Sequence, residues 1–223
     1  MKTVLGPIPL RDIAMLWLLL AGSTSLAETV TVSVHDRNGE PVPDVAVYVE
    51  RTVDRGSHTS SESGAVMDQV DQRFVPHLLV VQTGTLVEFP NSDTIAHHVY
   101  SFSHPNHFKL PIYKGNAHAP VRFEESGVVV LGCNIHDNML GYIIVVDTPV
   151  FGKTGVDGTA TFDGKLNEGD RVTIWSPRIR ANDSPLSMVV DAGDAASTFE
   201  FRLQKALRPP HQDQSESLSW SEY

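Results

Sequence analysis

Apolar and polar residues alternate with a period of two along much of this chain, as they do in β-strands with one buried face. The alternation covers residues 30–34 and 45–49 near the N-terminus, and residues 171–175 and 197–203 toward the other end. Turn-forming residues such as Asn38-Gly39 separate these segments. No segment shows the period of 3.6 that a helix of ordinary length requires. The pattern predicts an all-β fold.

One loop between two predicted strands carries the residue types that bind copper. Its sequence, Gly-Cys-Asn-Ile-His-Asp-Asn-Met-Leu-Gly at 132–141, places the only cysteine, Cys133, in one loop with a histidine and a methionine. One thiolate and two imidazoles in a trigonal plane, with a weak axial thioether, hold copper well in both of its oxidation states. The second imidazole is expected near the strand-like segment 85–89, where His97 is the first candidate and His98 the second.

These residues resemble the cupredoxins, the plastocyanin-like blue-copper proteins, and most of all the amicyanin type. In that type the loop reads Cys-x-x-His-x-x-Met, then x-Gly and an apolar strand, as residues 133–146 do here. The family also has an Asn six residues before a ligand His that is followed by x-Val, and Asn91, His97 and Val99 occupy these places. The resemblance spans residues 64 to 149 and implies a Greek-key β-sandwich that binds one copper ion, Cu(2+) or Cu(+). The ligands that it implies are His97, Cys133, His136 and Met139.

The sequence departs from the cupredoxin pattern at two positions. His98 stands where the family usually has an Asn that ties the two ligand segments together, and Ile135 stands where it usually has Pro before the loop histidine. In addition, Asp137 puts a carboxylate beside His136. A nearby negative charge favours the more positively charged oxidised metal. We therefore expect these changes to alter the reduction potential, with Asp137 lowering it.

A cupredoxin does not need the predicted strands before residue 60 and after residue 150. Taken in order, they resemble the two halves of a carboxypeptidase-regulatory-like or transthyretin-like sandwich. We expect residues 28–62 and 150–204 to form that sandwich, with the cupredoxin domain, residues 63–149, inserted between its halves. The rival arrangement is a single enlarged sandwich with extra edge strands. Pairing of residues 29–50 with residues 158–203 would favour the insertion.

Two segments have compositions that do not suit a packed core. Residues 56–64 are rich in serine and are predicted to be a linker. Residues 205–223 contain few apolar side chains and are predicted to be a disordered tail.

The N-terminal residues 1–27 predict a signal peptide. Basic residues precede the apolar run 13–21, and Ser25-Leu26-Ala27 matches a small-x-small cleavage site. The alternative is an uncleaved anchor, although this run is short for a bilayer. One cysteine cannot form an internal disulfide, so metal ligation would explain a thiol in an oxidising compartment. The family resemblance implies that this compartment is the periplasm.

The acidic composition excludes some classes of function. The formal net charge is -10 for the whole chain, and an acidic protein suits a basic redox partner better than nucleic acid. The sequence has no phosphate-binding glycine loop, no clustered basic patch and no nucleophile elbow.

Three histidines lie between the two ligand regions and need a separate interpretation. His104 and His107 are three residues apart and could bind a second metal, and His118 follows them. No carboxylate or thiol with matching spacing accompanies them, so we expect all three to be loop residues.

Taken together, the residues and the resemblance predict outer-sphere electron transfer and no enzymatic activity. His136 would lie at the surface and pass the electron to a docked periplasmic dehydrogenase or c-type cytochrome, as the family implies. Amicyanins serve methylamine oxidation, but partner choice depends on surface residues that a shared ligand loop does not determine.

Three other functions remain open. A periplasmic copper carrier or chaperone would use the same ligands to deliver cuprous ion. A structural β-sandwich module would hold the metal incidentally. A copper enzyme is disfavoured, because multicopper oxidases flank the cysteine as His-Cys-His, whereas Gly132 and Asn134 flank it here, and a binuclear centre needs a second cysteine.

Overall fold

The fold of this protein is nearly all β, as the alternation predicted. The computed structural model describes residues 29–51, 64–116, 118–184, 186–191 and 198–210. Within these ranges the single helical element is a 3-10 turn, η1 (His104–Asn106). No helix in the described ranges has the length and apolar content needed to cross a membrane. The predicted signal peptide and the residues of the predicted linker before Gly64 lie outside the described residues.

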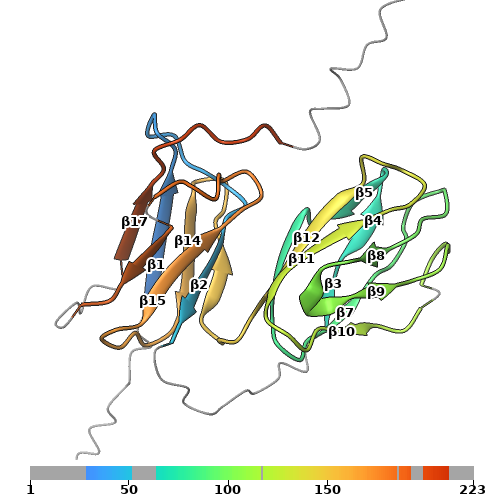
Figure 1. Ribbon diagram of the computed structural model, residues 1–223, viewed down its shortest axis with the longest axis horizontal. Helices are drawn as coiled ribbons and strands as arrows, with labels where there is room; N and C mark the ends of the chain where they lie inside the picture. Colours follow the sequence, from blue (N-terminus) through green and yellow to red (C-terminus); the bar gives the residue numbers. More distant parts are fainter. Residues whose placement is uncertain (1–28, 52–63, 117, 185, 192–197, 211–223) are drawn as a thin grey trace, which may run out of the picture.

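Strands from the two ends of the chain form one β-sandwich (Figure 1, blue and orange to brown strands). Its first sheet has the order β14-β1-β17, with β1 (Thr29–His35), β14 (Thr159–Asp163) and β17 (Thr198–Arg202). Its second sheet has the order β13-β2-β15-β16, with β2 (Ala46–Glu50), β13 (Phe151–Lys153), β15 (Arg171–Trp175) and β16 (Ser187–Val189).

The pairing in this sandwich joins segments that are far apart in the sequence. β1 is antiparallel to β14 and parallel to β17, and β2 is antiparallel to both β13 and β15. The alternating valines of β1 and β2 point into a core that also contains Phe199, Phe201 and Leu203. Residues 29–50 thus pair with residues 151–202.

The middle of the chain forms a second set of sheets (Figure 1, cyan to yellow strands). A five-stranded sheet has the order β6-β12-β11-β8-β9, with β6 (Leu78–Gln82), β8 (Tyr100–Ser101), β9 (Phe108–Lys109), β11 (Gly127–Gly132) and β12 (Leu140–Val146). A three-stranded sheet has the order β10-β7-β3, with β3 (Ala65–Val66), β7 (Leu86–Glu88) and β10 (Val121–Arg122). The hairpin of β4 (Asp68–Val70) and β5 (Arg73–Val75) completes this part.

Strand β12 lies between two hydrophobic cores, which explains its continuous apolar sequence. Successive side chains of a strand point to opposite faces. Ile143 and Val145 therefore belong to the core between the sheets of the middle segment, together with Phe74, Phe123 and Leu131. Ile144 and Val146 face the other way, into a cluster with Ala46 and Leu78 that joins the two sandwiches.

The predicted tail does not begin at residue 205. The backbone N–H of Lys205 donates to the Asp183 carboxylate at 3.1 Å, and the N–H of Arg208 donates to the carbonyl of Arg178 at 2.8 Å. Leu207 packs against the core of the first sandwich. The backbone N–H groups of Lys205 and Arg208 therefore have partners in the fold, and residues 211–223 lie outside the described residues.

Candidate metal centre

The loop with the cysteine is held at both ends by the β11–β12 ladder. Gly132, the last residue of β11, pairs with Leu140, the first residue of β12. Between them, the N–H of Met139 donates to the carbonyl of His136 at 2.9 Å, which closes the loop as a turn. The ladder and this turn fix the directions in which the side chains of Cys133 and His136 leave the backbone.

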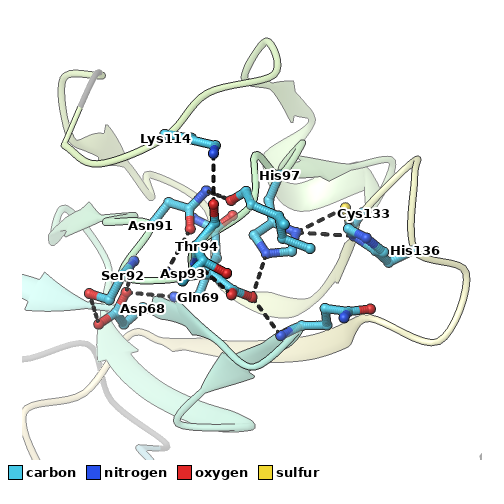
Figure 2. Close-up of polar contacts among 12 residues, drawn as sticks. Asp68, Gln69, Asn91, Ser92, Asp93, Thr94, His97, Lys114, Cys133 and His136 are labelled. Carbon is cyan, nitrogen blue, oxygen red and sulfur yellow. Dashed lines mark hydrogen bonds and ion pairs between the residues drawn. The ribbon is translucent and has the colours of Figure 1, made fainter.

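The segment with His97 is fixed by hydrogen bonds to a neighbouring segment. His97 and Tyr113 exchange two backbone hydrogen bonds, each of 3.0 Å. Asn91 is buried, and its side-chain amide donates to the carbonyls of Ile95 at 2.9 Å and Tyr113 at 2.8 Å. These bonds restrict the short turn from Asn91 to His97, so the imidazole of His97 projects inward toward the loop (Figure 2).

Three side chains converge at this point (Figure 2). The two Nδ1 atoms of His97 and His136 are 3.1 Å apart, and Sγ of Cys133 is 3.9 Å and 3.7 Å from them. Within the described part of the chain, this is the group of three metal-binding side chains that the structure brings together.

The size of this triangle fits a bound metal ion. Metal bonds of about 2.0 Å to imidazole nitrogen and about 2.3 Å to thiolate sulfur are known for zinc, an ion of similar size to copper. His97, Cys133 and His136 would hold such an ion, and one thiolate with two imidazole nitrogens is the donor set of a blue-copper site. The three donor atoms are thus close enough together to hold one ion between them.

The exposure of the site increases from one side to the other. His97 is completely buried and Cys133 nearly so, whereas His136 is half-buried. Next to His136 on the loop, Ile135 is 48% exposed and Asp137 is exposed. The edge of His136 is thus the part of the site that is close to solvent.

Met139 lies on the inner side of the loop. It is 1% exposed and belongs to the same hydrophobic core as Cys133. Met139 would be the residue that supplies a weak thioether contact to a copper ion held here.

A carboxylate that the sequence analysis did not single out holds the imidazole of His97. Nε2 of His97 lies 2.9 Å from Oδ2 of Asp93, four residues earlier. A carboxylate accepts a hydrogen bond, so Nε2 carries the proton and Nδ1 presents its lone pair to the metal position. The spacing of four residues was the available signal, but it becomes meaningful only with the turn that the chain makes here.

The charge of Asp93 is stabilised by its neighbours. The hydrogen bond from His97 is the largest cause that lowers the pKa of Asp93 to about 2, and the backbone N–H groups of Gln72 and Thr94 add to the effect. The carboxylate is therefore ionised at neutral pH. It places a full negative charge next to the ligand ring.

The structure brings His97, and not His98, into the group with Cys133 and His136. The ring of His98 is only 5% exposed, but it is not part of the converging group and packs instead against Tyr100, with ring centroids 5.4 Å apart. Burial, and then the positive charge of Lys109, lower the pKa of His98. His104, His107 and His118 are also outside the group.

No protein-family model matches the sequence, and no curated protein matches it. Solved structures do show similarity. A purple cupredoxin from Nitrosopumilus maritimus is 22% identical with a TM-score of 0.33, and the match covers 37% of this chain and 99% of that one. A variant of amicyanin in its reduced state is 19% identical with a TM-score of 0.34, covering 44% and 99%.

A copper-containing nitrite reductase from Thermus scotoductus SA-01 is 25% identical with a TM-score of 0.37, covering 44% of this chain and 26% of that one. The solved neighbours are thus cupredoxins and a copper enzyme. TM-scores this low support no inference about the function of this chain, so the function has to be inferred from the site itself.

Proposed function

We propose that this protein is an electron carrier with one blue-copper ion bound by His97, Cys133, His136 and Met139. The observation that carries the proposal is the convergence of one thiolate and two imidazole nitrogens from segments 36 residues apart, at distances that fit a trigonal copper site. A bound copper ion would supply the Cu(I)/Cu(II) redox couple, which accepts or releases one electron at a time.

The residues around the site hold the ligands in place in both states. The β11–β12 ladder fixes the loop, Asn91 fixes the turn, and Asp93 fixes the imidazole of His97. Ligands that do not rearrange when the charge of the metal changes lower the barrier to electron transfer, because little reorganisation is needed. The core around Cys133 excludes water from the thiolate.

The burial of the site favours electron transfer over copper delivery. A copper carrier has to expose its ligands to the protein that gives or receives the metal, but His97 is 0% and Cys133 4% exposed. An electron needs no such opening, since it can leave through the half-buried His136. We propose that His136 and the exposed Ile135 beside it meet a redox partner, of the class of a periplasmic dehydrogenase or a c-type cytochrome.

Location and domain organisation belong to the same proposal. We propose that residues 1–27 direct the chain to the periplasm and are then removed. We also propose that the sandwich of residues 29–50 and 151–203 is one domain that is interrupted by the copper domain, since the strands of its two halves pair with each other.

The test is to add cupric ion to the metal-free chain from residue 28 onward and to record its optical and electron paramagnetic resonance spectra. A blue site gives an intense thiolate-to-copper charge-transfer band and a narrow copper hyperfine splitting. His98→Gln is the matched control, which should keep both signals. A colourless protein with an ordinary tetragonal copper spectrum would refute the proposal.

A further inference from the structure

A row of four aromatic rings runs from the metal centre to the surface of the five-stranded sheet. The ring of His98 packs against Tyr100 with centroids 5.4 Å apart, Tyr100 against Phe102 at 4.9 Å, and Phe102 against His107 at 5.5 Å. We call these four residues the aromatic row. Each separation is within the range of direct ring contact.

The inner end of the aromatic row lies beside the residues of the proposed metal centre. His98 follows the proposed ligand His97 directly in the chain. Tyr100 pairs with Gly132, the residue before Cys133, and its ring lies on that glycine. A Cβ atom at Gly132 would be 2.8 Å from both Cζ and Oη of Tyr100, so only glycine allows the ring to lie this close to the backbone that leads to the thiolate.

The outer end of the aromatic row is open to solvent. Phe102 is 73% exposed, and His107 is exposed as well. The other half of the same sheet face is covered by the flanking sandwich, where Tyr142 packs against Trp175. The flanking sandwich thus leaves the sheet uncovered on the side where the aromatic row ends.

The segment that carries the row is fixed by hydrogen bonds. The hydroxyl of Ser101 accepts a hydrogen bond from the N–H of Ser103 at 3.1 Å, and the hydroxyl of Ser103 accepts one from the N–H of Val130 at 2.9 Å. Neither ring nitrogen of His98 has a hydrogen-bond partner among the residues the structure describes. His98 therefore takes part in the row through ring packing alone.

We propose that the aromatic row is a second electron route, which connects a one-electron redox protein docked at Phe102 with the copper site, separately from the route through His136. Phe102 is 73% exposed and stacks on the exposed ring of His107, so the outer end of the row offers two adjacent rings for contact with such a partner. In one transfer the donor protein loses one electron and Cu(II) becomes Cu(I), and no bond or proton changes place. This inference rests on the proposed function.

The test uses a ruthenium polypyridyl complex attached to His107 of the copper-loaded chain. A flash in the presence of an oxidative quencher produces Ru(III), which then takes one electron from Cu(I) and returns to Ru(II). We expect Phe102→Leu and Tyr100→Leu to slow this intramolecular step severalfold, because each removes one ring from the row. Ile112→Leu is the matched control, since Ile112 is exposed but outside the row.

The metal-free protein offers a second readout that does not depend on copper. There, Ru(III) at His107 should take one electron from Tyr100, whose phenolic proton passes to solvent, and the tyrosyl radical is detected by electron paramagnetic resonance. The signal should disappear in Tyr100→Phe. An unchanged signal in Tyr100→Phe, or unchanged rates in both leucine variants with the copper band intact, would overturn the aromatic row as a route. Absence of the copper band from the unaltered protein would instead refute the proposed function.

Discussion

The Nε2–H of His97 donates a hydrogen bond to the carboxylate of Asp93 at 2.9 Å, on the side of the ring opposite to the Nδ1 that faces Cys133. The ring of His97 is fully buried, and the side chain of Asp93 is 10% exposed. The carboxylate therefore determines which nitrogen of the ring is free for a metal, and it adds a negative charge at a short distance from that metal.

Replacing Asp93 with Asn should raise the reduction potential of the copper form. The carboxylate stabilises the more positive Cu(II) state, and removing the charge favours Cu(I). We expect a rise of tens of millivolts, measured by voltammetry on the copper-loaded protein. Asp137→Asn is the comparison, and because Asp137 is exposed and more strongly screened by solvent, its shift should be smaller. A lower potential in Asp93→Asn would contradict the role given to the carboxylate.

The metal-free protein should become less stable at acid pH through Asp93. Its folded pKa of about 2 lies below the ordinary value, so the ionised carboxylate stabilises the folded state above the unfolded pKa of about 3.9. This contribution is lost as the pH falls toward the folded pKa. Urea unfolding of the metal-free protein should be measured from about pH 5 to about pH 2. Over this range the free energy of unfolding should fall more steeply for the natural chain than for Asp93→Asn. If the unfolding free energies of the two proteins fell equally with pH, Asp93 would not be the source of this stability.

Replacing Cys133 with Ser should abolish the charge-transfer band and leave the fold intact. A hydroxyl does not deprotonate near neutral pH and is a poor ligand for copper. The side chain is 4% exposed in an apolar core, so the new hydroxyl should cost about 1–3 kcal/mol of unfolding free energy. The optical spectrum checks the first expectation and urea unfolding the second. A retained band would exclude Cys133 as the ligand.

Gly132→Ala should destabilise the protein and displace Tyr100. Its new Cβ would lie 2.8 Å from two atoms of the Tyr100 ring, closer than van der Waals contact allows. We expect a loss of about 1–3 kcal/mol, as for other overpacked sites. Gly64→Ala is the control, because the nearest atom to its Cβ would be 3.9 Å away. Urea unfolding compares the two variants, and equal stability would mean that the Tyr100 ring moves aside at no cost.

The sequence was sufficient to predict those parts of the site that depend on local spacing. Cys133, His136 and Met139 lie in one loop between two apolar strands, so their mutual proximity follows from the chain itself. The choice between His97 and His98 did not follow in the same way, because adjacent residues face opposite sides and either could be the buried one. In the structure, the backbone hydrogen bonds between His97 and Tyr113 hold His97, not His98, on the side of the cysteine loop.

Other features could not be predicted from local spacing or composition. The resemblance indicated that His98 replaces a residue that ties two segments together, and the structure shows instead a ring packed against Tyr100. Lys205 looked like the first residue of a polar tail, yet Asp183 accepts the hydrogen bond of its backbone. A partner such as Asp183, which is 22 residues away from Lys205, is not visible in the composition of the segment.

Strand β12 begins directly after Met139 and carries side chains into two separate cores. A substitution at Ile143 therefore affects the packing of the core in the middle segment. A substitution at its neighbour Ile144 affects the packing at the junction with the flanking sandwich. One strand therefore has to fit two cores at once, with alternate residues in each, which restricts substitution along its whole length. The flanking sandwich packs against β12 through Ile144 and Val146, so a substitution at this junction acts on the strand that begins directly after Met139.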